Sequence, residues 1–536
     1  MALDKDLQSI QEARDLARAA KEAQSEFKHF NQEQVNKVVK AMAEAGFATA
    51  EKLARMAVEE SGFGKVEDKI IKNQFGTKNV YESIKDLKTV GVIGVEANGK
   101  IVKIAVPMGV VCALVPSTNP TSTAMYKAII SLKARNAIVV SPHPKTANCT
   151  AESLKILSDA AENAGAPKGL IQCMKTLSID GTNALMHDKN IAVILATGGM
   201  PMVRSAYSAG KPAYGVGPGN VPAFIEKTAN VKKAVADIIY GTTFDNGTLC
   251  SSEQAMIVDR PLEEKAIEEA KALGAYFVNE EEKKKLEEVI HNNFIINAEI
   301  VGKPARFIAE YAGFTVPENT SVIIARCNAV GKVEPLSMEK LSPMLAFYTV
   351  DGWLEGCHRS IELLNFGGIG HTMVIHSNDE DIIMKFALEK PAFRILVNTP
   401  SSIGAVGYTT ALTPSMTLGP GTLGGSIISD NVSAQHLINI KKLAFETNPV
   451  NKGQSLSAFG GKVVQNVSTT ESPFMKNIEE RLRARAGNLP LEKPFSKKKP
   501  KQVESVKPDG KKSVTFGAGI SEEEIKKIIS EFNTKN

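Results

Sequence analysis

The segment Val110-Val111-Cys112-Ala113-Leu114-Val115 is an unbroken apolar run with the length of a buried β-strand. Similar runs follow at 137–140 and 191–195, and helical patterns lie between them at 123–133 and 148–165. Strands that alternate with helices of about 10–15 residues are typical of parallel βαβ units. Ligands of such sheets bind at the carboxyl ends of the strands. The segment therefore predicts an α/β fold with a doubly wound, Rossmann-like domain.

The rest of the chain extends this pattern. Residues 4–60 carry spaced Leu, Ile and Met among Ala, Glu and Lys, which predicts two or three amphipathic helices. A second set of alternating elements from about 236 to 430 predicts a second α/β domain. Apolar runs at 90–95 and 101–106 flank Asn98-Gly99, the pair that a type I′ turn favours, so we predict a β-hairpin there.

Composition narrows the class of protein. The 536 residues are 43% apolar and 23% charged, which is ordinary for a soluble globular protein of two or three domains. There is no apolar run of membrane-spanning length, and charges replace the apolar stretch of a signal peptide, so we expect a cytosolic protein. The six cysteines and eight histidines show no metal-ligand spacing, so we expect no metal site.

Lysines gather near the end of the chain. Residues 491–512 hold eight lysines against Glu492, Glu504 and Asp509, a surplus equal to the formal net charge of +5 of the whole chain. Prolines and glycines interrupt this stretch, and Phe495 is its sole aromatic residue. We therefore expect a solvated linker, with a nucleic-acid patch as the alternative.

The last residues, 520–536, predict a separate helix. Ser521 and Glu524 form a capping box. A narrow apolar stripe follows, made by Ile525, Ile528, Ile529 and Phe532. A lone helix this short is marginal in water, so the stripe needs a partner. We favour a tethered recognition helix over docking on the protein's own body.

One cysteine has informative surroundings, in the segment Thr243-Phe244-Asp245-Asn246-Gly247-Thr248-Leu249-Cys250-Ser251-Ser252-Glu253-Gln254. The Asn-Gly pair predicts a turn that delivers Cys250 to the start of the next element. A helix N-terminus there would lower the thiol pKa and point N–H groups at an oxyanion. From the spacing alone, a buried structural cysteine is an equal alternative.

This segment resembles the active-site motif of the CoA-acylating half of bifunctional aldehyde–alcohol dehydrogenases, a branch of the aldehyde dehydrogenase superfamily. The resemblance runs from about residue 5 to 445. Its other motifs are Ser61-Gly62-Phe63-Gly64, Pro116-Ser117-Thr118-Asn119-Pro120-Thr121-Ser122-Thr123, Ser141-Pro142-His143-Pro144, Ala196-Thr197-Gly198-Gly199 and Gly368-Ile369-Gly370-His371. The iron-dependent alcohol dehydrogenase half is absent, so we expect chemistry that stops at aldehyde and acyl-CoA.

The resemblance implies three catalytic residues. Cys250 would attack the aldehyde carbonyl and become an acyl thioester after hydride transfer. Asn119 and the Cys250 N–H would stabilise the oxyanion. His371 would exchange a proton with the thiols. Hydrolytic relatives carry a glutamate base in a segment that corresponds to residues 214–220, and this stretch has no carboxylate, so CoA is favoured over water as acceptor.

The resemblance also implies a nicotinamide cofactor. The expected contacts are Ser141, His143, Gly198, Gly199, Gly217, Glu339 and Leu341. The glycine pair opens a helix whose N-terminus can face a pyrophosphate, and Glu339 matches a ribose-binding glutamate. Lys145 is the only basic residue near the adenosine ribose position, so we expect NAD in preference to NADP. The GxGxxG at 419–424 does not open the first βαβ unit, so we expect a loop there.

The family implies the aldehyde dehydrogenase fold: a Rossmann-like cofactor domain, an α/β catalytic domain and a β-hairpin arm that dimerises by extending a partner's sheet. The expected parts are a cofactor domain at 1–235 with its hairpin at about 89–107, a catalytic domain at 236–427, an oligomerisation segment at 428–450, a basic linker at 451–519 and the helix at 520–536.

The predicted reaction is NAD-dependent oxidation of a short aldehyde, acetaldehyde above all, to its acyl-CoA. The alternatives are a hydrolytic aldehyde dehydrogenase and a catalytically silent scaffold protein. The terminal helix resembles encapsulation peptides, which implies a cytoplasmic microcompartment with shell or cargo proteins as partners. No nucleic acid or membrane partner is expected, and the enzyme should be a homodimer or a larger oligomer.

Overall fold

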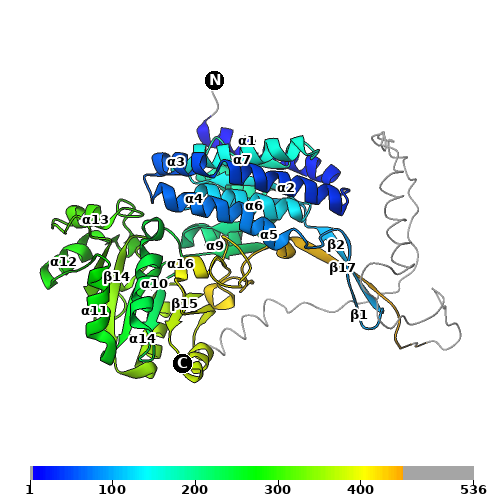
Figure 1. Ribbon diagram of the computed structural model, residues 1–536. Helices are drawn as coiled ribbons and strands as arrows, with labels where there is room; N and C mark the ends of the chain where they lie inside the picture. Colours follow the sequence, from blue (N-terminus) through cyan, green and yellow to red (C-terminus); the bar gives the residue numbers. More distant parts are fainter. Residues whose placement is uncertain (1–3, 449, 451–536) are drawn as a thin grey trace, which may run out of the picture. The chain divides into compact units, whose positions relative to one another are not determined.

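The first α/β unit forms a five-stranded sheet in which every pair of strands is parallel. β3 (Val110–Val115), the run that the sequence marks as a buried strand, lies at its centre. The sheet order is β5-β4-β3-β6-β7, and the other strands are β4 (Ala137–Pro142), β5 (Ile171–Cys173), β6 (Ile191–Thr197) and β7 (Ala213–Val216). The computed structural model describes residues 4–448 and 450 (Figure 1).

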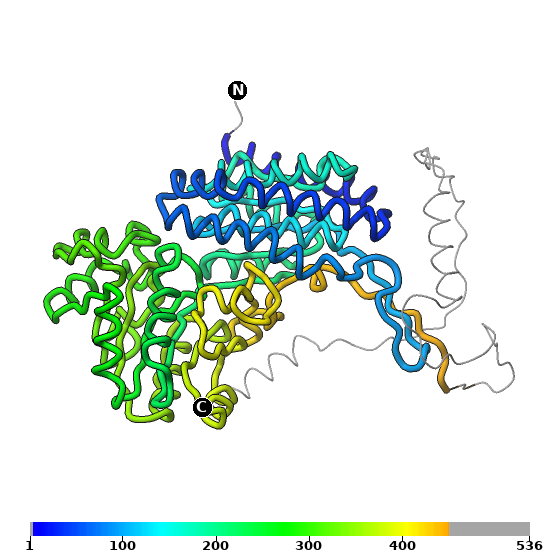
Figure 2. Tube along the Cα trace, in the orientation of Figure 1, coloured from blue at the N-terminus to red at the C-terminus, as the bar shows by residue number. Residues whose placement is uncertain are grey.

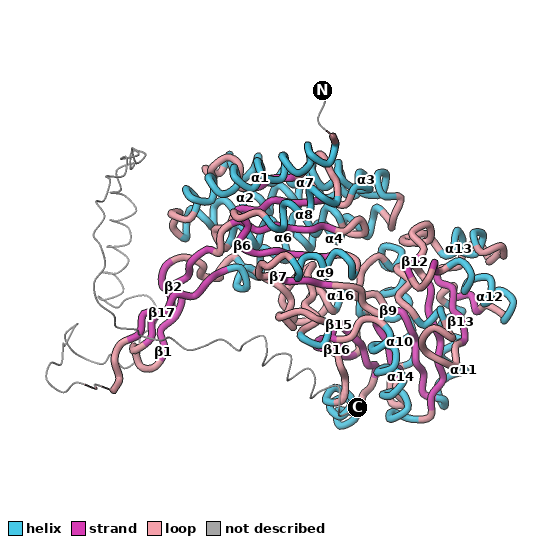
Figure 3. The backbone as a smooth tube through the Cα atoms, turned by 180° about the vertical axis from the view of Figure 1, so that it is seen from behind, coloured by secondary structure: helices cyan, strands magenta, loops and turns pink. Residues whose placement is uncertain are grey.

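Helices cover both faces of this sheet (Figures 1 and 3). The helices that contact its strands are α1 (Lys5–Phe27), α6 (Pro120–Lys133), α7 (Ala147–Asn163), α8 (Ile179–His187) and α9 (Met200–Ser208). Four more helices pack on α6 and α7: α2 (Gln32–Ala48), α3 (Ala50–Ser61), α4 (Val66–Gln74) and α5 (Val80–Ile84). α1 packs against α8, and α2 packs against α6 and α7. The buried face of α1 is a row of alanines, whose small side chains allow close approach.

The second sheet has seven strands, again all parallel, in the order β10-β13-β14-β9-β8-β15-β16. The strands are β8 (Val221–Ile225), β9 (Glu253–Asp259), β10 (Ala275–Phe277), β13 (Val322–Arg326), β14 (Met344–Val350), β15 (Gly370–His376) and β16 (Ala392–Val397). Its helices are α10 (Val231–Thr243), α11 (Glu263–Ala272), α12 (Glu280–Val289), α13 (Ala305–Tyr311), α14 (Gly352–Phe366), α15 (Glu380–Leu388) and α16 (Ser401–Gly404). A small hairpin joins β11 (His291–Asn292) and β12 (Ile295–Ile296).

The two faces of the seven-stranded sheet contribute to different cores. On β9, Met256 and Val258 belong to a core that also contains β3 and β4. Ile257, between them, belongs to a second core in which Phe224 and Phe386 stack with ring centroids 5.4 Å apart. Because alternate residues of a strand face opposite sides, β9 is buried on both faces. One core therefore joins the two sheets.

β8 marks the passage from one sheet to the other. It lies before the predicted domain boundary at residue 235, yet it pairs with β9 and β15 in the seven-stranded sheet. The chain crosses between the sheets at 217–220, where a glycine- and proline-containing stretch separates β7 from β8. The sequence pattern did not reveal this crossing, because both strands are short apolar runs.

The predicted hairpin consists of β1 (Gly91–Glu96) and β2 (Ile101–Pro107), which pair antiparallel. Asn98 and Gly99 both have positive φ, and the Lys100 N–H donates to the Ala97 carbonyl, as in a type I′ turn. β17 (Ile438–Ala444) adds to the other side of β2, and Figure 2 shows the two segments running side by side.

The structure confirms the predicted α/β class with two parallel sheets. The GxGxxG sequence forms a loop with one 3₁₀ turn, as expected. Within the described range, no helix combines the length and apolar character needed to cross a membrane. The predicted basic linker at 451–519 and helix at 520–536 lie outside the described residues.

Candidate active site

The two sheets meet at an edge that collects most of the predicted site residues. Asn119 follows β3, and Ser141 and His143 end or follow β4. The glycine pair 198–199 follows β6, and Gly217 follows β7. All of these are carboxyl ends of parallel strands, where open α/β sheets bind ligands.

The seven-stranded sheet faces this edge with the amino ends of its central strands. Gly219 precedes β8, Cys250 precedes β9 and His371 lies at the start of β15. These three strands are neighbours in the order β9-β8-β15. Residues that lie far apart in the sequence are thus brought together by the sheet register.

Cys250 follows the 3₁₀ turn η3 (Phe244–Gly247) and comes three residues before β9. Asp245 and Asn246 adopt positive φ, and the element that follows Cys250 is a strand, so no helix N-terminus faces the thiol. Without a helix dipole the thiol is not acidic. Burial, and then the Glu339 carboxylate, raise the pKa of Cys250 to about 12, although Arg394 and Lys72 act in the opposite direction.

Gly219 holds Cys250 and His371 close together. A Cβ at this position would lie 2.2 Å from the carbonyl oxygen of Cys250 and 3.1 Å from Nδ1 of His371. The Gly219 N–H donates to Oε1 of Glu339 at 2.8 Å. Nucleophile, histidine and glutamate therefore surround one glycine, and any side chain there would separate them.

His371 is buried and neutral. Its Nδ1 lies 2.9 Å from Oγ1 of Thr372, and its Nε2 has no hydrogen-bond partner among the described residues. Burial, and then the guanidinium of Arg394, lower its pKa to about 3. A neutral imidazole with a free nitrogen can accept a proton from a thiol.

Asn119 is held by hydrogen bonds on both ends of its carboxamide. Its Nδ2 donates to the Thr248 carbonyl at 3.1 Å, two residues before Cys250, and to Oγ1 of Thr118 at 3.1 Å. Its Oδ1 accepts a hydrogen bond from Nζ of Lys72. Lys72 also binds Asp245 and Thr248, so the amide is tied to the loop that carries the nucleophile.

Sequence reasoning missed Lys69, Lys72 and Asp245, which form a buried ion cluster behind Asn119. Burial would raise the pKa of Asp245, but the two ammonium groups outweigh it and hold that pKa below its ordinary value. Burial also lowers the pKa of Lys72 to about 8. The available signal was Asp245 inside the cysteine motif, together with two lysines three residues apart on one helix.

The predicted cofactor residues that follow β4 and β6 differ in exposure, and the glycine pair is the open part. α9 begins directly after Gly199, and a Cβ on Gly198 would meet nothing within 4 Å. Ser141 Oγ lies 2.9 Å from Oγ1 of Thr182, and His143 is exposed. An open helix N-terminus at the carboxyl edge of a parallel sheet fits the pyrophosphate of a dinucleotide.

The remaining predicted contacts lie in the loop before β14 or at the crossing between the sheets. Glu339 is partly exposed, and burial raises its pKa to about 8. Leu341 has positive φ, and its carbonyl accepts a hydrogen bond from the Gly302 N–H at 2.8 Å. Gly217 lies against Met200, whose sulfur would be 2.7 Å from a Cβ. In residues 4–448 no group of three or more His, Cys, Asp or Glu side chains is arranged to hold a metal ion.

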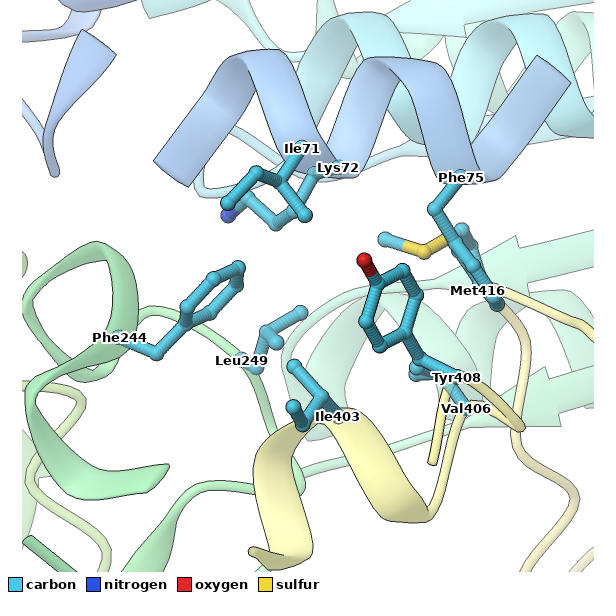
Figure 4. A pocket seen from close by; sticks show the side chains of 9 residues that line it. All are labelled: Ile71, Lys72, Phe75, Phe244, Leu249, Ile403, Val406, Tyr408 and Met416. Atoms are coloured by element: carbon cyan, nitrogen blue, oxygen red, sulfur yellow. The ribbon is translucent and has the colours of Figure 1, made fainter. Parts of the chain in front are cut away.

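A small, partly open apolar pocket lies beside the nucleophile loop (Figure 4). α4, the residues that follow it, the loop before Cys250 and the segment from α16 onward supply its walls. The lining residues are Ile71, Lys72, Phe75, Phe244, Leu249, Ile403, Val406, Tyr408 and Met416. Leu249 directly precedes Cys250, so the pocket borders the segment that carries the nucleophile.

This fold and site define an aldehyde dehydrogenase. A sequence profile described as "Aldehyde dehydrogenase family" matches residues 6–284, and the chain belongs to this family. A solved acetylating aldehyde dehydrogenase from Geobacillus thermoglucosidasius is 51% identical with a TM-score of 0.83, over 84% of this chain and 100% of that one. These matches confirm the resemblance to the acylating branch that the motifs predicted.

Curated relatives agree. The bifunctional aldehyde–alcohol dehydrogenase of Escherichia coli (strain K12) is 45% identical over 441 residues, which are 81% of this chain and 50% of that protein. This chain therefore spans about half the length of that relative. The acetylating succinate-semialdehyde dehydrogenase of Clostridium kluyveri is 36% identical over 81% of this chain and 95% of its own length.

Two further solved structures bear on ligands and location. The propionaldehyde dehydrogenase of Rhodopseudomonas palustris, solved with bound propionyl-CoA, is 28% identical with a TM-score of 0.74, over 81% of this chain and 94% of that one. The propionaldehyde dehydrogenase of the Clostridium phytofermentans fucose utilisation microcompartment is 29% identical with a TM-score of 0.74, over 80% and 96%.

Proposed function

We propose that the chain oxidises a short aldehyde to its acyl-CoA, with NAD⁺ as hydride acceptor: aldehyde + CoA + NAD⁺ ⇌ acyl-CoA + NADH + H⁺. The observation that carries this proposal is that the Cys250 backbone and the neutral imidazole of His371 both lie against Gly219. It supplies a nucleophile and a proton acceptor at one point. The stretch 214–220 offers no carboxylate to activate water.

The chain's own groups would act in sequence. The Cys250 sulfur, as thiolate, bonds to the aldehyde carbon, and the carbonyl oxygen becomes an oxyanion. Asn119 and the Cys250 N–H stabilise that charge. Bound NAD⁺ supplies the hydride acceptor that converts the adduct to a thioester. His371 then takes the CoA thiol proton, the CoA sulfur bonds to the acyl carbon, and the Cys250 sulfur leaves.

The decisive experiment measures NADH formation from acetaldehyde with and without CoA. With CoA we expect steady turnover, and without it a burst of about one NADH per active chain as the thioester accumulates. Rapid steady turnover without CoA would instead identify a hydrolytic enzyme. Cys250→Ser should abolish both phases while leaving the melting temperature unchanged, and undiminished turnover in this variant would refute the role of Cys250.

The pocket favours a short uncharged aldehyde. Its lining is apolar apart from the Tyr408 hydroxyl and Lys72, and Lys72 is already paired with Asp245. An acidic aldehyde such as succinic semialdehyde would find that cation compensated. We expect kcat/KM to be higher for acetaldehyde and propionaldehyde than for succinic semialdehyde, and the reverse order would overturn this assignment.

The ribose end of the cofactor site favours NAD over NADP. Lys145 is the basic residue nearest to Ser141 and His143, and its ammonium lies over the ring of Phe63, 5.6 Å from the centroid. That contact directs it away from a 2′-phosphate. We expect a lower KM for NAD⁺ than for NADP⁺, and equal values would show that Lys145 is available to a phosphate.

Free sheet edges support a dimer. In the described part of the chain β16 pairs with β15 alone and β17 with β2 alone, so each has one unpaired edge. Ile440 of β17 and Phe393 of β16 are 48% and 45% exposed. We propose that β17 of one protomer extends the partner's sheet at β16. Ile440→Lys should lower the mass measured by light scattering, and an unchanged mass would refute this pairing.

The C-terminal segment supports a microcompartment location in the cytoplasm. The Ser521–Glu524 capping box and the apolar stripe after it resemble an encapsulation helix that binds shell or cargo proteins. A fluorescent protein fused to residues 451–536 should co-localise with shell proteins, whereas the same fusion without 520–536 should not. Equal localisation of both fusions would contradict the proposal.

A further inference from the structure

The ion cluster behind the site contains two lysines with different second partners. Both Lys69 and Lys72 bind Asp245, and both side chains are at most 5% exposed. Besides Asp245, Lys69 donates a hydrogen bond to the Thr118 carbonyl at 3.0 Å. Lys72 instead donates to Oδ1 of Asn119 and to Oγ1 of Thr248 at 3.2 Å.

The bond from Lys72 decides which way the Asn119 carboxamide is turned. A carboxamide can be rotated by 180° with little change in shape, and hydrogen bonds select the orientation. An ammonium group carries donors only, so it can face Oδ1 but not Nδ2. Lys72 therefore directs Nδ2 to the side of Thr248 and Cys250, where oxyanion charge develops.

Asp245 holds Lys72 in this position. It is fully buried and accepts from the Lys65 N–H at 2.7 Å, from Lys69 at 2.9 Å and from Thr248 Oγ1 at 2.6 Å, besides Lys72. Gly64 lies against the same carboxylate, since a Cβ there would be 1.9 Å from Oδ1. The carboxylate is thus fixed from four directions.

Lys72 brings a positive charge to the side of the cluster that faces the nucleophile loop. The other charged or titratable groups that face Cys250 are Glu339, Arg394 and His371. Asp68 also faces the cluster, through the Asp245 N–H. Positive potential at this point favours the thiolate and the oxyanion over their neutral forms.

We propose that Lys72 is a positioning residue of the acylating reaction: held by Asp245, it orients the Asn119 amide toward the oxyanion and supplies positive charge to the Cys250 loop. This inference rests on the proposed roles of Cys250 and Asn119. It gives a role in the reaction to a residue of α4, which lies 178 positions before the nucleophile in the sequence.

The test compares Lys72→Met with Lys69→Met in the full-length chain. Each substitution removes one buried ammonium and leaves Asp245 paired with the other, so the two variants are matched in charge and burial. Both carry Cys173→Ser, because Cys173 is the other partly exposed cysteine among the six. The readouts are kcat and KM for acetaldehyde and CoA, and the rate of Cys250 alkylation by iodoacetamide from pH 6 to 10.

We expect Lys72→Met to lower kcat about 10²-fold, as removal of an oxyanion donor does, with little change in either KM. Its alkylation profile should move to higher pH, because a positive charge near the thiol is lost. Lys69→Met should lower kcat by less than tenfold and move the profile less. Equal effects of the two variants, or a normal kcat and profile in Lys72→Met, would overturn the proposal.

Lys72→Gln keeps the inference testable if the methionine variant does not fold. Glutamine can still donate to Asn119 but carries no charge. We expect it to share the shifted alkylation profile and to keep a kcat above one-tenth of the parent's. A kcat below that, in a folded protein, would refute the orienting role. Full turnover by Cys250→Ser would refute the proposed function itself, which separates the two failures.

Discussion

Replacing Gly219 by alanine should separate Cys250 from His371. The added Cβ would lie 2.2 Å from the Cys250 carbonyl oxygen, and contacts below 3.0 Å are essentially never found. The two atoms must therefore move apart by at least 0.8 Å. Gly219 does not have positive φ, so alanine suits its backbone and the effect is purely one of space.

A displacement of this size falls on the backbone of the nucleophile. Misplacement of a catalytic group by about 1 Å costs about 10²-fold in rate, which corresponds to about 2.7 kcal/mol of barrier. The second contact, 3.1 Å to Nδ1 of His371, adds crowding on the side of the proton acceptor. We therefore expect kcat for CoA-dependent NADH formation to fall about 10²-fold.

The assay needs a control glycine near the site. A Cβ on Gly367 would make an ordinary contact of 3.7 Å with Cβ of Asn220, and its φ of −168° suits alanine. Gly367→Ala should thus keep kcat within about twofold of the parent. If the melting temperature shows that Gly219→Ala is folded and its kcat also stays within twofold of the parent's, the space at Gly219 between Cys250 and His371 is not needed for the reaction.

Three other predictions concern the stability of the site, its pH dependence and its preference among aldehydes. Asp245→Asn leaves Lys69 and Lys72 without their carboxylate, so urea unfolding should show a loss of about 3–5 kcal/mol, and a loss below 1 kcal/mol would contradict the buried ion cluster. The pKa of His371 is about 3 in the folded chain against an ordinary 6.5, so the unfolded chain binds more protons and stability falls as pH drops from 6.5 toward 3. His371→Asn should make this decline shallower, as urea melts at each pH would reveal; an equal slope would show that the imidazole is not buried neutral. Val406→Phe narrows the pocket, so kcat/KM for propionaldehyde should fall about tenfold more than for acetaldehyde, and parallel losses would place the aldehyde elsewhere.

The sheet-forming residues were predictable because their signal is local. The run 110–115 coincides with β3, and Asn98-Gly99 marks the hairpin turn, since each pattern reports directly on backbone conformation. The element after Cys250 was not predictable in the same way. The apolar run at 255–258 is short enough to suit a strand or the start of a helix, and only burial on both faces of the sheet decides for the strand.

The ion cluster behind Asn119 lay beyond sequence reasoning for another reason. Lysines three residues apart on a helix ordinarily form a solvated face, and Lys69 and Lys72 differ from that rule only because Asp245 reaches them from more than 170 positions away. Motifs, by contrast, identified Cys250, Asn119 and His371 as residues worth locating. The structure adds what surrounds them, including Gly219, which lies against the Cys250 carbonyl and the His371 imidazole.

The placement of Cys250 before β9 has a consequence for altering this protein's preference among aldehydes. β9 is paired with β8 on one edge and β14 on the other, so Cys250 directly precedes a strand that is held on both edges. The opposite wall of the pocket, with Ile403, Val406 and Tyr408, comes from a loop-rich segment that adds no strand to either sheet. Mutational libraries confined to that wall can therefore explore new aldehydes while the reacting centre stays in place.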